Sequence, residues 1–539
     1  MVLECLCARW RFLTSTEGML VRRFSSGSFV ITLTIAGLLP LFIALDRTPI
    51  PWIDEVLWAS TSVSVISGHP ATPSVLGGFP RTGRFDLFYG PVGIQIGAIW
   101  MKFLGISAWN WRMLSFVGGV SVIALAAVLV STLGGSHLLA ATAACLVAFS
   151  TPMGGSINSG RLDTLTVAFE LAALILLVLS LQRQRWHAYF YSACAGVAIA
   201  SAALSTPRAF TFCLGLAIGA IALICLGWRK QVVEAFLPAA VISTAAFCLW
   251  IYSQQLSPLA WLHYMASATK GDSGNISPLL GGSWGSKEAL YLPELAAPVL
   301  FSMVAFCLCW IWLKERRNSG LRARRWPELV FVLAVGASNM LLSFVLFSRA
   351  LNYEVFFIVP VLAGLLVFSA LLLEANCSVN IRRLFLALWL AFAALGVGVR
   401  AGKILEFSGS WSNRDPRPIF AFITMHVPTS STVLGVDPCY YWAVQDSGSK
   451  YLWIKENTTP GLSSHLAFDA DKVLTRAAGH PVYLVWKSGS VMPSELSELV
   501  LRKTASFEMP AGEIDLFSRL RPSIRTGYPQ TELYELRVH

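Results

Sequence analysis

Residues 29–45 read FVITLTIAGLLPLFIAL and are followed, after a short polar stretch, by Pro51-Trp52-Ile53-Asp54-Glu55. The first segment reaches the lower limit of about 17 apolar residues for a helix that crosses a bilayer. The second segment places two adjacent carboxylates at the mouth of that helix, just outside the hydrocarbon. Acidic side chains at such a position usually serve a function. The alternative interpretation is a solvated loop in which Asp54 caps the following helix.

The composition is that of a polytopic membrane protein. The chain has 539 residues, of which 55% are hydrophobic and 13% charged, with a mean hydropathy of +0.62. Soluble domains carry about 25% charged residues. The net charge of +11 is not by itself a sign of nucleic-acid binding, because the basic residues must first be assigned to the two sides of the membrane. Cys439 is alone in the polar C-terminal part, so no disulfide can form within that part, and no Cys/His spacing resembles a metal site.

Apolar runs long enough to span a membrane continue along the chain. They lie at 29–45, 113–132, 138–152, 163–182, 188–204, 209–227, 232–250, 294–313, 328–347, 352–373 and 384–400. These runs predict about eleven transmembrane helices. With the N-terminus in the cytosol, the basic block 314–325 also falls in the cytosol, as the positive-inside rule requires.

The apolar stretch 90–105 is a further candidate span, but a span there would place the block 314–325 outside. We therefore expect 91–104 to form a juxtamembrane helix in the outer interface, together with a second helix at 56–67. Trp100, Trp109 and Trp111 suit the headgroup region. The first outer loop would then extend from 46 to 112.

The sequence predicts three regions. Residues 1–28 form a cytoplasmic N-terminal segment, 29–400 a transmembrane domain with the outer loop 46–112, and 401–539 a small extracytoplasmic α/β domain. In this last region, short β-type runs alternate with helical stretches. The predicted strands are 432–436, 451–454, 482–486 and 533–538, and the predicted helices are 416–426 and 493–503.

Isolated charged residues gather on the outer side of the predicted membrane domain. They are Asp54, Glu55, Asp86, Arg161, Asp163, Arg208 and Arg349. Each has a simpler explanation, since Arg161 can pair with Asp163 and the other arginines can reach lipid headgroups. Taken together, they suit a phosphate bound by arginine beside a carboxylate that acts as a base.

That combination is the chemistry needed to use a polyprenyl-phosphate sugar. Arginines would neutralise the phosphate leaving group as the glycosidic bond breaks. A carboxylate would take the proton of the acceptor hydroxyl as that hydroxyl attacks the anomeric carbon. A single displacement of this kind inverts the anomeric configuration.

These residues resemble those of the GT-C glycosyltransferases, in particular the protein O-mannosyltransferase and aminoarabinose–lipid A transferase group, from about residue 29 to 365. The similar motifs are the acidic pair Asp54-Glu55, the aromatic-proline segment 85–91 (FDLFYGP), the run 104–115 (LGISAWNWRMLS), the helix entry 159–163 (SGRLD) and the segment 348–353 (SRALNY). Their order and common side are more specific than any one motif. The chain departs from the aminoarabinose transferases at Gly90 and Asn352, where those enzymes carry basic residues, which argues against an aminoarabinose donor.

The resemblance implies a GT-C-like fold and a role for each matching residue. Asp54 would be the catalytic base, and Glu55 would be either its partner in the catalytic pair or a ligand of a metal ion or of the acceptor. The implied donor-phosphate residues are Arg208, Arg349 and Tyr353, and the implied substrate-pocket residues are Asp86, Tyr89, Arg161 and Asp163. No cofactor is required, and a divalent cation near Asp54, Glu55 and Asp163 is left open.

The implied activity is that of a multi-pass glycosyltransferase of a bacterial inner membrane, with a cytoplasmic N-terminus. It would move a sugar from a polyprenyl-phosphate donor to a protein, lipid or glycan acceptor on the outer face. A transporter or flippase for a lipid-linked glycan is the main alternative, and a non-catalytic lipid- or glycan-binding membrane protein is another. Transporters favour charges at mid-membrane and matched halves, and the sequence shows no second half that repeats the first.

Overall fold

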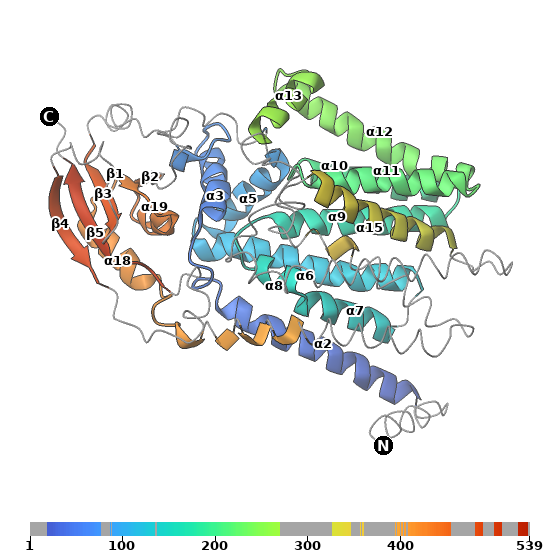
Figure 1. Cartoon of the computed structure of the whole chain (residues 1–539), viewed down its shortest axis with the longest axis horizontal. Helices are drawn as coiled ribbons and strands as arrows, with labels where there is room; N and C mark the ends of the chain where they lie inside the picture. Colours follow the sequence, from blue (N-terminus) through green and yellow to red (C-terminus); the bar gives the residue numbers. More distant parts are fainter. Residues whose placement is uncertain are drawn as a thin grey trace, which may run out of the picture.

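The computed structural model describes residues 19–76, 87, 89–134, 137–269, 326–346, 356, 358–360, 394, 396–398, 400–402, 404–405, 408–453, 480–488, 501–508 and 527–536. Within these residues the chain forms a bundle of long helices with a small β-sheet at one end (Figure 1). The predicted span 294–313, and most of the spans 352–373 and 384–400, lie outside the described residues.

The bundle helices coincide with predicted spans. They are α2 (Met19–Ile43), α6 (Ala108–Thr132), α7 (His137–Phe149), α9 (Asp163–Gln182), α10 (Trp186–Ala203), α11 (Ala209–Cys225), α12 (Arg229–Ser253) and α15 (Trp326–Leu346). Among the described helices, α6, α9 and α12 are long and apolar enough to cross a membrane by length and composition. The predicted number of about eleven spans stays a prediction.

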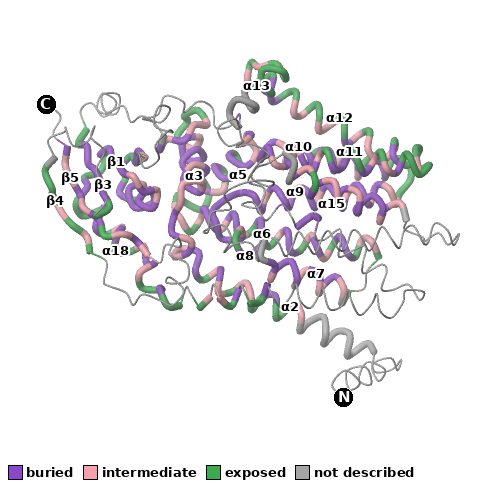
Figure 2. The backbone as a smooth tube through the Cα atoms, viewed as in Figure 1, coloured by how far each residue is buried: buried purple, intermediate pink, exposed green. Residues whose placement is uncertain are grey.

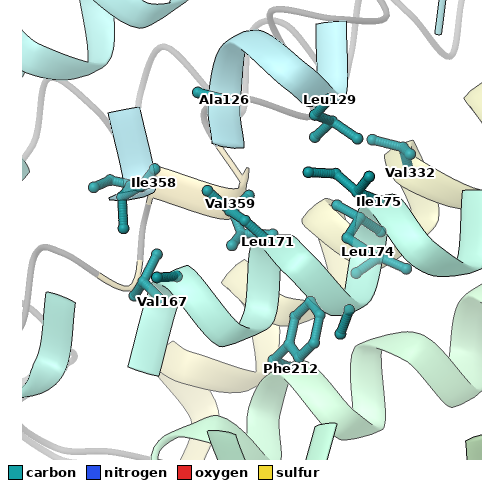
Figure 3. Packing of buried hydrophobic residues seen from close by; sticks show 14 of the residues in the cluster. Ala126, Leu129, Val167, Leu171, Leu174, Ile175, Phe212, Val332, Ile358 and Val359 are labelled. Carbon is teal, nitrogen blue, oxygen red and sulfur yellow. The ribbon is translucent and has the colours of Figure 1, made fainter. Parts of the chain in front are cut away.

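Helix α9 lies at the centre of the bundle. In its most apolar stretch 67% of the residues are buried, against 17% in α12, where exposed residues run along the helix (Figure 2). Leu171 and Leu174 of α9 pack with Phe212 of α11 and Val332 of α15 (Figure 3). The apolar side chains that α12 leaves exposed suit contact with lipid, while α9 holds the bundle together.

Helices α6 and α9 approach closely at Gly118. A Cβ atom at this position would lie 2.7 Å from the Thr164 hydroxyl oxygen and 2.8 Å from the backbone nitrogen of Leu165. Only a residue without a side chain fits this contact. The approach fixes the outer end of α9 against α6, and the outer end of α9 carries Asp163.

Helices α3 (Ile53–Ile66) and α5 (Pro91–Leu104) lie between the long helices of the bundle and the sheet (Figure 1). The other short elements are the 3-10 turn η1 (Ser74–Leu76), α8 (Thr151–Ser156), which follows α7, and α13 (Pro258–Thr269), which follows α12. Helix α5 has 14 residues, fewer than the about 20 that a span needs, and agrees with the predicted juxtamembrane helix. Its Phe103 side chain is 81% exposed, which suits insertion into the outer leaflet.

The acidic pair lies inside α3. Trp52 occupies the N-cap position, so Asp54 belongs to the first helical turn and is not the capping residue. The positive end of the helix dipole favours the two carboxylates in this turn. The alternative interpretation of Asp54 as a helix cap is therefore wrong.

The C-terminal region forms a mixed sheet in the strand order β2-β1-β3-β5-β4, in which β1 is parallel to β2 and β3, and β5 is antiparallel to β3 and β4. Its elements are α18 (Arg417–His426), β1 (Thr432–Gly435), η5 (Pro438–Tyr440), α19 (Tyr441–Asp446), β2 (Lys450–Trp453), β3 (Val482–Lys487), β4 (Leu501–Phe507) and β5 (Thr531–Leu536). The predicted strands and the helix 416–426 agree with these elements to within two residues.

One prediction for this region is wrong. Residues 501–503, predicted as the end of a helix, begin strand β4. They do so because β4 pairs with β5, with Leu501 opposite Leu536. A pairing between distant segments therefore overrides the local helical preference. Residues 493–500 lie outside the described residues.

The C-terminal region shares a hydrophobic core with the outer loop. Val56 and Trp58 of α3 and Trp111 of α6 belong to the same buried cluster as Ile419 of α18 and Trp442 of α19. The C-terminal region therefore packs directly against the end of the bundle that carries α3. The division into domains at about residue 401 stays a prediction.

We predict that Gly118→Ala destabilises the bundle, because the added methyl group meets backbone atoms of α9 that cannot move aside. Overpacking of this kind costs about 1–3 kcal/mol, measurable as a lower thermal unfolding temperature in detergent. Gly398→Ala is the matched control, since nothing lies within 4 Å of a Cβ atom there. Equal unfolding temperatures for the two variants would contradict the close approach.

The predicted topology places the end of α5 outside the cell membrane. In a background with the native cysteines replaced, Ile106→Cys should react with a membrane-impermeant maleimide in intact cells. Ile106 is exposed and lies within the predicted outer loop 46–112. Lys230→Cys, on the predicted cytosolic side, should react only after the membrane is opened. The reverse pattern of labelling would contradict the topology.

Candidate active site

The predicted outer ends of the helices meet at the end of the bundle that bears the sheet. Leu45, at the end of α2, accepts a hydrogen bond from Arg112 of α6 (2.9 Å). Trp52, before α3, donates its indole N–H to the backbone oxygen of Ser159 (2.9 Å). The backbone N–H of Val92 in α5 donates to the oxygen of Leu204 after α10 (3.0 Å). The segments that carry the predicted site residues thus converge.

Arg161 bridges two of the predicted carboxylates. Its Nη1 lies 2.8 Å from Asp54 Oδ2, and its Nε lies 2.7 Å from Asp163 Oδ2. The guanidinium also lies over the Trp52 ring, 5.7 Å from the ring centroid, within the range of a cation–π contact. The Asp54 side chain is 26% exposed, whereas those of Arg161 and Asp163 are each 6% exposed. Asp54 is therefore the carboxylate of this cluster that solvent or a substrate can reach.

Glu55 has a different environment from its neighbour. The side chains of Glu55 and Arg112 are both fully buried, with Arg112 Nε 2.9 Å from Oε1 and Nη2 2.9 Å from Oε2. Trp442 of α19 donates its indole N–H to the same Oε1 (3.1 Å). Both carboxylate oxygens are thus occupied, and no part of the group faces solvent.

The loop before α9 closes around this pair. Gly160 has a φ of +69°, and a Cβ atom there would lie 2.6 Å from Glu55 Cγ. The backbone oxygen of Gly160 accepts a hydrogen bond from the Trp111 indole (2.7 Å). The glycine in the motif SGRLD therefore lets the backbone pass against Glu55 while the next residue, Arg161, reaches Asp54.

Tyr89 and Arg208 lie on segments that contact α3 and α5, respectively, or follow such a contact closely in the chain. The Tyr89 ring packs against Trp58 of α3, with 4.7 Å between ring centroids. Arg208 is half-buried at the N-cap of α11. It follows the loop whose Leu204 oxygen binds the backbone of α5. Asp86, Arg349 and Tyr353 lie outside the described residues, so their predicted roles stay predictions.

The described residues contain no group of three or more His, Cys, Asp or Glu side chains that could hold a metal ion. The Arg161 guanidinium already supplies a positive charge in contact with both Asp54 and Asp163. The ionic partner of each carboxylate in this cluster is thus a side chain of the protein.

Three residues of this region were not predicted as site residues. Arg112 lies in a quoted motif, and as an isolated charge at the outer end of a span it carried the same signal as Arg161. Trp442 is 387 residues from Glu55, and nothing in the sequence indicated a contact between these two residues. Glu170 is fully buried within α9, and neither of its carboxylate oxygens bonds to a described residue.

Comparison with known proteins identifies the fold. No family profile and no curated protein sequence matches the chain. A crystal structure of ArnT from Cupriavidus metallidurans in the apo state matches 95% of this chain and 98% of its own, with a TM-score of 0.55 and 12% identity. ArnT from Cupriavidus metallidurans bound to undecaprenyl phosphate matches 94% of this chain and 98% of its own, with a TM-score of 0.56 and 13% identity. The resemblance to the GT-C glycosyltransferases is thus confirmed at the level of the fold.

We predict that Arg112→Met destabilises the protein strongly, because it leaves the Glu55 carboxylate buried without an ionic partner. Breaking a buried pair in this way costs about 3–5 kcal/mol. Lys503→Met is the matched control, since it breaks an ion pair with Glu532 in which the lysine is 48% exposed. Exposed pairs contribute about 0–1 kcal/mol. Arg112→Met should lower the thermal unfolding temperature much more than Lys503→Met. Equal decreases in unfolding temperature would contradict the stabilising role of the Glu55–Arg112 pair.

Proposed function

We propose that the chain is a membrane glycosyltransferase that moves a sugar from a polyprenyl-phosphate donor to an acceptor, with Asp54 as the general base. The observation that carries the proposal is the contrast within the acidic pair. Asp54 is partly exposed and held by Arg161 at 2.8 Å, whereas Glu55 is sealed from solvent. An oriented, accessible carboxylate at the membrane surface is what proton removal from an acceptor hydroxyl requires.

The nature of the donor is supported by the shared fold. The ArnT structure described above contains undecaprenyl phosphate, a polyprenyl phosphate. We propose a donor of this class for the present chain, with its phosphate bound by Arg208 and by Arg349 and Tyr353. Arginine suits this role because its planar donors bind phosphate oxygens in pairs.

The proposed reaction is a single displacement. The acceptor hydroxyl gives its proton to Asp54 while its oxygen forms a bond to the anomeric carbon. The bond from that carbon to the phosphate oxygen breaks, and the polyprenyl phosphate leaves with both electrons. The anomeric configuration inverts. Arg161 holds the Asp54 carboxylate in one orientation, and preorganisation of this kind is a large part of catalytic power.

In this proposal Glu55 shapes the site and does not react, because its oxygens are already bonded to Arg112 and Trp442. Asp163 and Tyr89 belong to the substrate pocket, together with Asp86. The reaction needs no cofactor. The proposed location is a bacterial inner membrane, with the sheet on the outer face and a protein, lipid or glycan as acceptor.

A transporter for lipid-linked glycans is the second candidate, and Glu170 is the observation that favours it. An acid buried in a membrane helix is characteristic of transport pathways. The contact between Asp54 and Arg161 favours the transferase, since transport does not need an oriented base at the outer surface. Mass spectrometry of envelope glycans from a deletion strain would show which sugar depends on the protein.

We predict that Asp54→Asn lowers sugar transfer by about 10²–10⁴-fold, the usual contribution of a general base. The amide keeps the shape of the side chain, so the folded fraction should not change. It cannot accept the proton of the acceptor hydroxyl, so transfer should fall. The measurement is transfer from the polyprenyl-phosphate sugar identified by the deletion strain.

Asp46→Asn is the matched control. Asp46 precedes α3 in the same predicted outer loop. Its carboxylate lies 4.0 Å from Arg47, and its side chain is 41% exposed. We expect it to transfer sugar at the rate of the unmodified protein. An Asp54→Asn variant that is as active as this control would refute the assignment of the base.

A further inference from the structure

The segment that follows the carboxyl end of β1 contains the residue of the C-terminal region that contacts the acidic pair, Trp442. In open α/β sheets, functional groups gather beyond the carboxyl ends of parallel strands. Strand β1 lies between two parallel neighbours, and the chain leaves it at Gly435 to form η5 and then α19. Trp442 in α19 is therefore presented from the edge of the sheet that such folds use for function.

The connection from β1 to α19 is held firmly. The Asp437 carboxylate accepts a hydrogen bond from the backbone N–H of Cys439 (3.0 Å). From the neighbouring strand β2, the Tyr451 hydroxyl donates to the oxygen of Asp437 (2.6 Å) and the Trp453 indole donates to the oxygen of Val436 (2.8 Å). The position of α19 is thus fixed by the sheet.

Trp442 makes a directed contact within this rigid frame. Its side chain is buried, and its indole N–H points to Glu55 Oε1 at 3.1 Å. Glu55 and Asp54 are adjacent in the first turn of α3. Any rotation of that turn that carried Asp54 away from Arg161 would also pull Glu55 away from Trp442 and Arg112.

A second set of contacts fastens the chain just before α3. Arg47 donates to the oxygen of Trp411 (2.8 Å) and to Asp415 Oδ2 (3.2 Å). Arg414 Nη1 donates to the hydroxyl oxygen of Thr48 (3.3 Å). The segment that carries Asp54 is therefore tied to the C-terminal region on both sides.

We propose that Trp442 is a positioning residue for sugar transfer, which holds the first turn of α3 through Glu55 so that Asp54 faces the acceptor. This inference rests on the proposed function. It makes the C-terminal region a part of the catalytic unit, because Trp442 reaches the base through one intermediate residue. Trp442 does not contact the reacting atoms.

The first test replaces Trp442 by Phe, which keeps an aromatic ring and removes the N–H donor. We expect kcat to fall about tenfold, the effect of losing one hydrogen bond to a charged group, with KM for the polyprenyl-phosphate donor unchanged. Trp100→Phe is the matched control, since it removes an indole donor that bonds to the backbone oxygen of Asn110 (2.8 Å) and not to Glu55. Its kcat should stay at the level of the unmodified protein. Both variants are compared at equal folded fractions, measured by thermal unfolding.

The second test is a double-mutant cycle of Trp442→Phe with Glu55→Met, which removes the acceptor oxygens that Gln would keep. If Trp442 acts through Glu55, the double variant should lose no more kcat than Glu55→Met alone. Independent losses that multiply, or a Trp442→Phe variant with the kcat of Trp100→Phe, would overturn the positioning role. The same cycle can be measured from unfolding temperatures, which does not require an active enzyme. If the two substitutions are coupled in unfolding but the unmodified protein transfers no sugar, the proposed function is refuted. The contact between Trp442 and Glu55 would still be supported.

Discussion

The end of the bundle that bears the sheet depends on one buried ion pair, between Glu55 and Arg112. Two charged groups without exposure to water need a partner for every polar atom, since an uncompensated buried charge costs several kcal/mol. The end of α2 supplies the Leu45 oxygen to Arg112, and α19 supplies the Trp442 indole to Glu55. Satisfying this pair therefore requires the membrane helices and the sheet to come together at one point.

The same constraint separates the roles of two adjacent acids. Successive residues of an α-helix point about 100° apart, so neighbours in the first turn of α3 face different surroundings. Glu55 points into the interior, where its carboxylate bonds to Arg112 and Trp442. Asp54 points toward Arg161, and its side chain is partly exposed. Glu55 cannot move without breaking three hydrogen bonds. Because Asp54 is its neighbour in the same helical turn, the backbone of Asp54 is held in place as well. A carboxylate next to a rigid group of this kind suits proton transfer better than one on a free loop.

The sequence predicts this arrangement only where the signal is local. Apolar runs identify the helices of the bundle, and the charged motif SGRLD identifies Arg161 and Asp163 as outer-face residues that lie with Asp54. The burial of Glu55 was not predictable, because an acid that pairs with Arg112, 57 residues away, looks the same in the sequence as an acid that reacts. Strand β4 and the role of Trp442 were missed for the same reason, since each depends on a partner distant in the chain. Local periodicity determines elements, whereas contacts between distant residues determine which of two adjacent carboxylates is accessible.

The shared core gives a reason for the C-terminal region to pack where it does. In the proposed reaction a sugar leaves a membrane lipid for an external acceptor, so the site would border lipid on one side and water on the other. Trp442 and Ile419 of α18 belong to the same buried cluster as Trp58 and Trp111, and this cluster would close the water-facing side of that site. Cutting the chain before α18 would expose those aromatic rings and leave Glu55 with Arg112 but without its indole donor. The helices and the sheet therefore meet at Glu55, whose carboxylate bonds to α6 through Arg112 and to α19 through Trp442.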